Sequence, residues 1–350
     1  MAELAERRAR VEQLLQAARE LADRESNAGR ALRSRLLETC GLSAAGIELG
    51  ITRCLETRPE PEHLTALLAS TPEASQAHVL LSGNVFVAAL RAIALAVAAS
   101  DRVRVRASRR DPALAEALQA LTPQLFELTT TLAPAPGERV WAYGSDATLA
   151  EVRQSLPKGV WFHAHGSGFG AVLLDAAAST DLDTDARAIA LDTALFDQRG
   201  CLSPRVVCVS GGAEQAKSVA RALATELTLL ERELPLGPSS PEELADARKN
   251  RDAAAYAFEL FDAGSGWVSL SNEVVVPAPT RCLHVTCTSD AVQALGLLTP
   301  HVTCIATNAP PAQLSASFSG ARLVALGEMQ RPPLDGPVDR RHGAGGELIA

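Results

Sequence analysis

The chain has 350 residues, of which 47% are hydrophobic and 21% are charged, so it is long enough for two domains with substantial cores and too apolar for wholesale disorder. Its net charge of -8 and its aromatic content of 4% argue against a basic, base-stacking surface for nucleic acids. The longest apolar run, residues 92–99, is far shorter than a membrane span.

The seven cysteines form an odd set without a Cys-x-x-Cys pair, and the first residues are charged and lack the apolar core of a signal peptide. Both observations favour reduced thiols and a cytoplasmic location. His163 and His165 have no third or fourth ligand at finger-like spacing, so we expect no metal site.

The first part of the chain is predicted to be helical. Apolar residues at helical spacing in residues 2–40 indicate two amphipathic helices, and Ser43 would cap a third that reaches about Glu56. This stretch carries no recognisable chemistry. We therefore expect residues 1–76 to form an N-terminal helical segment that packs on the following domain.

From Ala77 onward the pattern alternates between strands and helices. The predicted strands cover residues 78–81, 102–106, 140–143 and 159–164, and the predicted helices cover 85–99, 111–121 and 146–156. Such alternation is typical of a parallel sheet covered by helices, whose ligands lie beyond the carboxyl ends of the strands. Residues 77–195 are taken as the first such domain.

The alternation continues after residue 196. Strands are predicted over residues 206–209, 267–270, 273–276 and 283–286, and helices over 213–231, 241–258 and 290–297. Residues 196–320 would form a second domain of the same style, followed by a loop-like tail over residues 321–350.

Cys201 lies in a short stretch, residues 196–204, between a predicted helix over 186–196 and a predicted strand over 205–209. Such a junction holds a side chain on rigid elements, and Gly200 lets another group approach the backbone. A thiol there is a nucleophile if nearby amides or cations lower its pKa from about 8.5. The alternative is a small buried hydrophobic side chain, the usual role of a cysteine.

Two loops at predicted strand ends could bind an oxygen or a phosphate. The turn over residues 82–84 carries Asn84, whose amide could donate to an oxygen that is becoming negative, or could simply cap the next helix. The loop over residues 166–170 has the spacing Gly-x-Gly-x-Gly, and it could cradle a phosphate or be an ordinary tight turn.

The end of the second predicted strand carries Arg106, followed by Ser108, Arg109 and Arg110, with no acidic residue before Asp111. In nucleotide-binding sheets an acidic residue here reads the ribose 2′-hydroxyl, whereas an arginine accommodates a 2′-phosphate. If a nicotinamide cofactor binds, these charges favour NADP. The alternative is a solvated charged loop.

These pieces, in this order, resemble the aldehyde dehydrogenase superfamily, and most closely its long-chain fatty acyl-CoA reductase branch. That branch includes the reductase subunit of bacterial luminescence operons and its non-luminous relatives. The segments that carry the resemblance are residues 196–204, 82–85, 106–112 and 326–334. The resemblance implies an aldehyde-dehydrogenase-like α/β fold, with two doubly wound Rossmann-like parallel-sheet domains and an N-terminal helical segment.

The resemblance also implies a role for each matched residue. Cys201 would be the nucleophile that accepts the acyl group, and Asn84 would donate to the oxyanion together with the Cys201 backbone amide. The residues implied for the NADPH cofactor are Arg106, Ser108 and Arg109 at the adenosine ribose, Gly166 and Ser167 near the pyrophosphate, and Glu273, in the segment Glu-Val-Val-Val-Pro, at the nicotinamide ribose.

The implied activity is NADPH-dependent reduction of a long-chain fatty acyl-CoA, or another acyl thioester, to the aldehyde through an acyl group on Cys201. Hydrolytic members of the superfamily carry a glutamate that activates water, whereas residues 170–181 contain none, so the thioester should persist until hydride arrives. An acyl-protein synthetase or an acyltransferase is the kind of partner implied, with assembly into a homo-oligomer left open. The alternative is a non-redox acyl-transfer or scaffold subunit on a degenerate aldehyde dehydrogenase scaffold.

Overall fold

A computed structural model of the chain describes residues 2–288, 290–296, 298–309, 314, 317–341, 343 and 345–350. Contacts between residues divide the chain into two units. The first unit comprises Met1–Cys40, Ile47–Ser167 and Pro333–Ala350, and the second comprises Gly41–Gly46 and Gly168–Pro332.

The first unit is built on a six-stranded sheet with the order β13-β5-β4-β1-β2-β3. Its strands are β1 (Ala77–Leu80), β2 (Val103–Arg106), β3 (Glu127–Leu128), β4 (Arg139–Tyr143), β5 (Trp161–His165) and β13 (Glu347–Leu348). Every pairing is parallel except that of β13 with β5. The parallel sheet predicted for this part of the chain is therefore confirmed.

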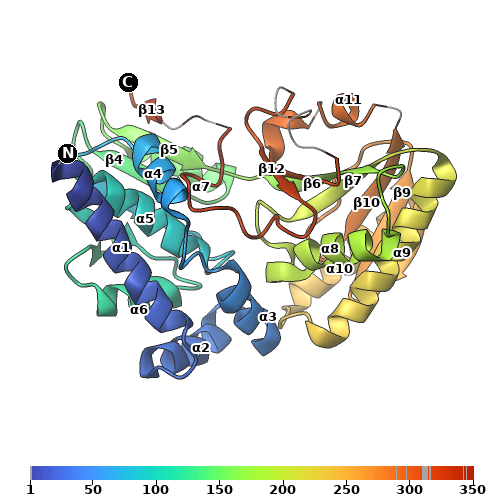
Figure 1. The fold of residues 1–350 in the computed structure, drawn as a ribbon, viewed down its shortest axis with the longest axis horizontal. Coiled ribbons are helices and arrows are strands. Elements are labelled where there is room, and N and C mark those ends of the chain that lie inside the picture. The colour runs from blue at the N-terminus through green and yellow to red at the C-terminus, as the bar shows by residue number, and fades with distance from the viewer. Residues whose placement is uncertain are drawn as a thin grey trace. The chain divides into compact units, whose positions relative to one another are not determined.

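Some helices of this unit pack directly against the sheet, and the others pack on those helices (Figure 1). They are α1 (Ala2–Ala22), α2 (Asn27–Thr39), α4 (Pro61–Ser70), α5 (Ala88–Ala99), α6 (Ala113–Leu121) and α7 (Asp146–Ser155). Because α5 contacts β1 on one side and α1 on another, all its residues from Leu90 onward are buried. The helix α3 (Ala44–Leu49) begins in the second unit and ends in the first, where a π-helical turn (Gly50–Cys54) follows it.

The second unit has a seven-stranded sheet with the order β12-β11-β6-β7-β10-β9-β8, parallel except at β8. Its strands are β6 (Phe169–Asp175), β7 (Pro204–Ser210), β8 (Glu259–Ala263), β9 (Gly266–Ser271), β10 (Leu283–Thr288), β11 (Val302–Thr307) and β12 (Arg322–Ala325). Its helices are α8 (Leu182–Ala194), α9 (Ala213–Glu233), α10 (Pro241–Ala257) and α11 (Ala291–Gly296). Figure 1 shows α8 and α9 on one side of this sheet and α11 on the other, where an apolar cluster fills the space beneath α11.

The division between the units differs from the expected boundary at residues 195/196 and lies between Ser167 and Gly168. The reason is β6, a strand that the sequence analysis did not predict. It begins with Phe169 and Gly170 and pairs with β7 and β11, so it belongs to the second sheet. Because Gly168 and Gly170 lie on either side of Phe169, the start of this strand has the composition of a loop.

Two further expectations, the strand over residues 273–276 and the loop-like tail, were wrong. Residues 273–276 form no strand, because they leave β9 and pass over the apolar cluster, against which Val274 and Val276 pack. The tail predicted to be loop-like contains β12 and β13, which pair with β11 and β5. The helix predicted over residues 290–297 is α11, and its last predicted residue, Leu297, lies outside the described residues. None of the described helices is both long and apolar enough to cross a lipid bilayer.

Candidate active site

Among the seven cysteines, all of which lie in the described part of the chain, only Cys201 and Cys287 are partly exposed. Burial raises the pKa of the Cys208 thiol to about 12 and that of the Cys282 thiol to about 11, so neither supplies a thiolate at neutral pH. Burial raises the pKa of Cys304 as well. Cys201 itself is partly exposed.

The chain reaches Cys201 by a tighter path than the predicted helix over 186–196. The helix α8 ends at Ala194, and a short 3-10 turn follows over Leu195–Gln198. In that turn Phe196, Asp197 and Gln198 have positive φ angles of 55°, 51° and 61°. Three consecutive non-glycine residues in the left-handed region immediately before the candidate nucleophile are unusual and need local support.

Beyond Cys201 the loop packs closely on β6. A side chain at Gly170 would overlap the Leu202 carbonyl oxygen and the end of the Met329 side chain, so only glycine fits there. The Gly170 amide donates to the Ser203 carbonyl oxygen at 2.8 Å. The Thr303 hydroxyl, on β11, donates to the carbonyl oxygen of Cys201. The backbone after the sulfur is thus fixed against two strands.

The segment before Pro333, part of the 326–334 signature, also supports this loop. The Gln330 amide donates to the Ser203 hydroxyl at 3.0 Å and to the Asp192 carbonyl oxygen at 3.1 Å. The Met329 amide donates to the Asp192 carboxylate at 3.3 Å. Through these contacts the segment over residues 326–332 holds the loop after Cys201 in place.

In the first unit, the two loops at the carboxyl ends of β1 and β2 lie together. A Cβ at Gly83 would lie 2.6 Å from the Ser108 hydroxyl oxygen, so the β1 turn approaches the β2 loop more closely than any side chain would allow. Asn84 is exposed in that turn and makes no side-chain hydrogen bond within the described residues. It does not cap α5, which begins four residues later at Ala88 after Val87.

The basic residues at the end of β2 and in the loop that follows are available to a ligand. Arg109 and Arg110 are exposed and Arg106 is half-buried, and no described carboxylate pairs with any of the three. Asp111 instead accepts a hydrogen bond from Thr39 at 2.9 Å, and burial raises the pKa of its carboxyl. The first acidic residue after the strand is thus already engaged with α2.

The glycine loop is less open than expected. The Ser167 amide donates to the Asp146 carboxylate, with 2.8 Å between N and Oδ1, and a Cβ at Gly166 would overlap the same oxygen. Arg341 donates to the Ser167 carbonyl oxygen at 3.0 Å. A phosphate at this loop would therefore have to compete with the Asp146 carboxylate for the Ser167 amide.

Glu273 is exposed, and it does not open a strand as predicted. Its backbone carbonyl oxygen accepts hydrogen bonds from the His284 ring at 2.8 Å and from the Ser271 hydroxyl at 3.1 Å. The carboxylate of Glu273 has no partner among the described residues. The segment is thus anchored by its main chain while the carboxylate remains accessible.

The two strand histidines are structural. His163 stacks on Trp141 and His165 on Tyr143, with ring centroids 4.6 and 4.5 Å apart. Burial, helped by the adjacent Arg139 guanidinium, lowers the pKa of His163 to about 3. No group of three or more metal-binding side chains occurs within the residues that the structure describes.

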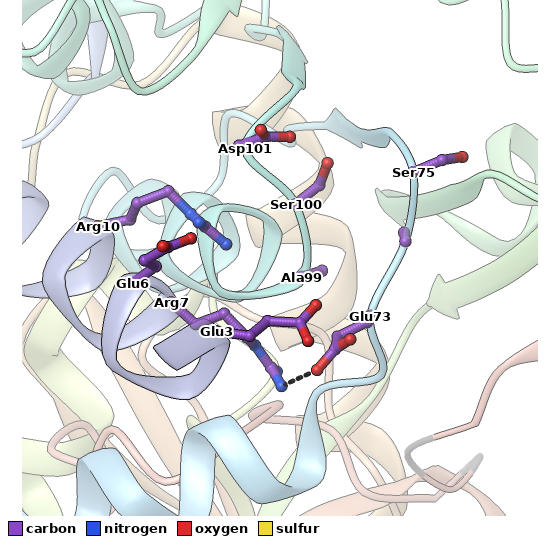
Figure 2. Close-up of a pocket in the computed structure, with 10 residues that line it drawn as sticks. Glu3, Glu6, Arg7, Arg10, Glu73, Ser75, Ala99, Ser100 and Asp101 are labelled. Atoms are coloured by element: carbon purple, nitrogen blue, oxygen red, sulfur yellow. Dashed lines mark hydrogen bonds and ion pairs between the residues drawn. The ribbon is translucent and has the colours of Figure 1, made fainter. Parts of the chain in front are cut away.

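A cavity of about 450 Å³ lies elsewhere in the first unit, between the start of α1, the segment before β1 and the end of α5. Figure 2 shows its mixed charges, among them the ion pair of Arg7 with Glu73 at 2.8 Å. Arg7 also donates to three backbone carbonyl oxygens, so its charge is already satisfied. This cavity opens near the amino end of β2 and holds none of the predicted site residues.

The predicted site residues fall into two groups. Cys201 and Glu273 belong to the second unit, whereas Asn84 and the other predicted cofactor residues belong to the first. The pairing of Asn84 with Cys201 stays a prediction. Sequence reasoning missed Asp146, although its position directly after a parallel strand could have marked it, and it missed the support that Asp197 and Gln198 give the loop.

Comparisons with known proteins agree with the fold. The structure is similar to an NAD-dependent benzaldehyde dehydrogenase from Corynebacterium glutamicum (TM-score 0.66, 13% identity, covering 94% of this chain and 82% of that one). It is also similar to a putative methylmalonate-semialdehyde dehydrogenase from Sinorhizobium meliloti 1021, solved with NAD (TM-score 0.69, 13% identity, covering 98% and 83%). Lactaldehyde dehydrogenase from Escherichia coli gives a TM-score of 0.66 at 13% identity, covering 99% and 85%.

These likenesses establish an aldehyde-dehydrogenase-like α/β fold, as predicted. No curated protein sequence matches the chain significantly. A comparison with protein families, however, matches residues 48–333 to the family described as Acyl-CoA reductase (LuxC). Because this match covers well over half of the sequence, the chain belongs to the LuxC family of acyl-CoA reductases.

Proposed function

We propose that the protein reduces a long-chain fatty acyl-CoA, or another acyl thioester, to the aldehyde with NADPH, through an acyl group held on Cys201. Membership of the acyl-CoA reductase family supports an oxidoreductase that acts on an acyl substrate. The observation that carries the proposal is that Cys201 is a partly exposed residue on a loop whose backbone is fixed on both sides.

In the acyl-transfer step the Cys201 thiolate attacks the thioester carbonyl carbon. A bond forms between Sγ and the acyl carbon, the bond to the CoA sulfur breaks, and CoA leaves as a thiolate that takes up a proton. Asn84 would donate to the carbonyl oxygen while it carries negative charge, which is worth about 10²–10³ in rate. Its exposed amide, without a partner in the described structure, is available for that role.

The acyl group should survive on Cys201 because β6 carries no base next to it. This strand runs Phe-Gly-Ala-Val-Leu-Leu before its first carboxylate at Asp175. Asp175 lies at the far end of the strand, and its carboxylate accepts from the Ala177 amide at 3.0 Å. A positioned carboxylate is what would activate water for hydrolysis, so the strand's composition favours reduction over hydrolysis.

The first unit suits the adenosine end of an NADP cofactor. Ser108 and Arg109 would hold the phosphorylated ribose, and Arg106 would add charge, beside the turn in which Gly83 packs closely against Ser108. Gly166 and Ser167 would lie near the pyrophosphate, and Glu273 would contact the nicotinamide ribose. When bound, the reduced nicotinamide supplies the hydride that turns the acyl thioester into an aldehyde and returns Cys201 to its thiolate.

The alternative, a non-redox acyl-transfer subunit, draws support from one observation. The Asp146 carboxylate accepts from the Ser167 amide, which a pyrophosphate would otherwise use. If the cofactor cleft had degenerated, the protein would still be acylated on Cys201 but would not bind NADPH. The acyl group would then pass to a partner acyltransferase or come from an acyl-protein synthetase.

One experiment separates these possibilities. The wild type and Cys201→Ala are incubated with a radiolabelled long-chain acyl-CoA, with and without NADPH, and acyl-protein, NADPH consumption and aldehyde are measured together. The proposal predicts label on the wild type, aldehyde when NADPH is present, and neither in Cys201→Ala. Retained turnover in Cys201→Ala would overturn the proposal, and label without NADPH consumption would favour the alternative.

The proposal also covers the location of the protein and its state of assembly. None of the seven cysteines, all in described positions, forms a disulfide, which suits the reducing cytoplasm. A homo-oligomer is the proposed state of assembly, and the molar mass of the purified protein in solution tests it.

A further inference from the structure

The turn before Cys201 is strained, and buried side chains hold it in place. Phe196, Asp197 and Gln198 all lie in the left-handed region, with φ between 51° and 61°. This conformation is unfavourable for a residue with a Cβ, so three in succession persist only when their surroundings determine them. All three side chains are buried, and Phe196 packs in the core at 2% exposure.

Gln198 uses its full hydrogen-bonding capacity inside the protein. Its amide nitrogen donates to the carbonyl oxygens of Pro204 and Cys282, both at 2.7 Å. Its amide oxygen accepts from the backbone amides of Thr280 and Cys282, at 3.1 and 2.8 Å. At 0% exposure this side chain ties the turn to the start of β7 and to the start of β10.

Asp197 ties the same turn to a different place. Its carboxylate, at 5% exposure, pairs with Arg281 at 2.6 Å and accepts from the Gly237 amide at 3.1 Å. Arg281 is itself left-handed, with φ of 57°, and it also donates to the Leu234 carbonyl oxygen at 2.7 Å. A buried, hydrogen-bonded ion pair thus joins two strained backbone positions.

We infer that Gln198 and Asp197 are positioning residues for the Cys201 thiol, which they orient through the backbone. The inference rests on the proposed role of Cys201 as the acyl-accepting nucleophile. Only Arg199 and Gly200 separate the fixed turn from Cys201, and Thr303 fixes the Cys201 carbonyl on the other side. With both flanks held, the direction in which Sγ leaves the loop depends on the left-handed turn.

If Gln198 and Asp197 position the thiol, a substitution in the turn should affect two reactions of the Cys201 sulfur to different extents. Attack on an acyl-CoA needs the carbonyl carbon, the thiolate and the oxyanion donors in one geometry, and a misplacement of about 1 Å costs about 10²-fold. Alkylation by iodoacetamide needs only an accessible thiolate. A positioning role therefore predicts a large loss in acylation and a small change in alkylation.

The test uses the full chain with Gln198→Gly and Gln198→Met. Glycine tolerates the left-handed conformation and removes the four hydrogen bonds, so Gln198→Gly should fold even if Gln198→Met does not. Gln215→Ala is the matched control, because that glutamine caps α9 through the Gly212 amide and has no link to the turn. Thermal unfolding confirms that each variant is folded.

We expect single-turnover acylation of Gln198→Gly by a long-chain acyl-CoA to fall about 100-fold, with iodoacetamide alkylation of Cys201 within about 3-fold of the wild type. Gln215→Ala should match the wild type in both reactions. Wild-type acylation in folded Gln198→Gly, or an equal fall in both reactions, would overturn the inference. If Cys201→Ala were still acylated, the proposed function itself would fail, which is a separate result.

Discussion

The Asp146 carboxylate accepts a hydrogen bond from the Ser167 backbone amide, with 2.8 Å between the two atoms. Asp146 opens α7 at the carboxyl end of β4, and Ser167 follows the neighbouring strand β5. This contact occupies an amide of the loop at which we expect the pyrophosphate of the cofactor to bind. It places a negative charge where NADPH would bring another.

Replacing Asp146 should therefore strengthen cofactor binding. In Asp146→Ala the Ser167 amide is released and one like charge is removed, so we expect the Kd for NADPH to fall about 3- to 10-fold. Fluorescence titration measures the change. Glu151→Ala, which removes an exposed charge from the same helix, should leave the Kd within about 2-fold, and unchanged binding in Asp146→Ala would place the pyrophosphate elsewhere.

The arginines after β2 should determine the choice of cofactor. Arg109→Ala removes a charge that has no carboxylate partner in the described structure, so we expect KM for NADPH to rise about 10-fold or more while KM for NADH changes little. Steady-state kinetics with both cofactors test this. Arg104→Ala is the control, because that arginine lies on β2 itself and faces Glu127 at 3.6 Å. Equal effects on both cofactors would contradict a 2′-phosphate contact.

Burial should make alkylation selective. Because burial raises the pKa of Cys208 to about 12 and of Cys282 to about 11, brief treatment with iodoacetamide at pH 8 should leave both unmodified in the native protein. Peptide mass spectrometry should find label on Cys201 and Cys287, and prior incubation with acyl-CoA should protect Cys201 alone. Rapid labelling of Cys208 would show that β7 opens readily.

Gly170 should tolerate no side chain. In Gly170→Ala the new methyl group meets the Leu202 carbonyl oxygen, which is backbone and cannot move aside, so we expect a loss of about 1–3 kcal/mol in the free energy of unfolding. The displaced loop should also slow acylation of Cys201. Urea unfolding gives the stability, with Gly296→Ala as control, because a methyl group there meets nothing within 4 Å. Equal stability of the two variants would refute the close contact.

Acid should destabilise the first unit through His163. The pKa of this ring in the folded protein is about 3, against 6.5 when exposed, because it is buried at 6% exposure and contacts Arg139. Between these values the unfolded chain binds a proton that the folded chain does not, so the stability falls as the pH drops from about 6.5 toward 3.

His163→Phe keeps a ring to stack on Trp141 and removes the titrating group. We expect its free energy of unfolding to fall less steeply with acid, by roughly 3–5 kcal/mol over that range. Urea unfolding at a series of pH values measures the slope. His301→Gln, at an exposed histidine, should keep the wild-type slope, and an unchanged slope in His163→Phe would exclude this ring as the source.

Local patterns in the sequence were enough for much of the protein. The alternation of apolar strands and amphipathic helices predicts two helix-covered parallel sheets, since each element shows its own periodicity within a few residues. The stretch around Cys201 and the Ser-Gly-Asn turn carried the resemblance to the reductase family in their residue order. Such patterns depend only on residues close together in the sequence, so they can be recognised without knowing what packs against them.

Only the tertiary structure decided the rest. It assigned β6 to the second sheet, because pairing with β7 and β11 is a contact between distant segments and leaves no periodic mark in a strand that starts with glycines. It bound Gln198 to Cys282 and Asp197 to Arg281, pairs that are 84 residues apart in the sequence. It also set Asp146 against Ser167. Each of these contacts depends on which distant residues come together when the chain buries its apolar surface. Such long-range contacts cannot be predicted from the local patterns of a single sequence.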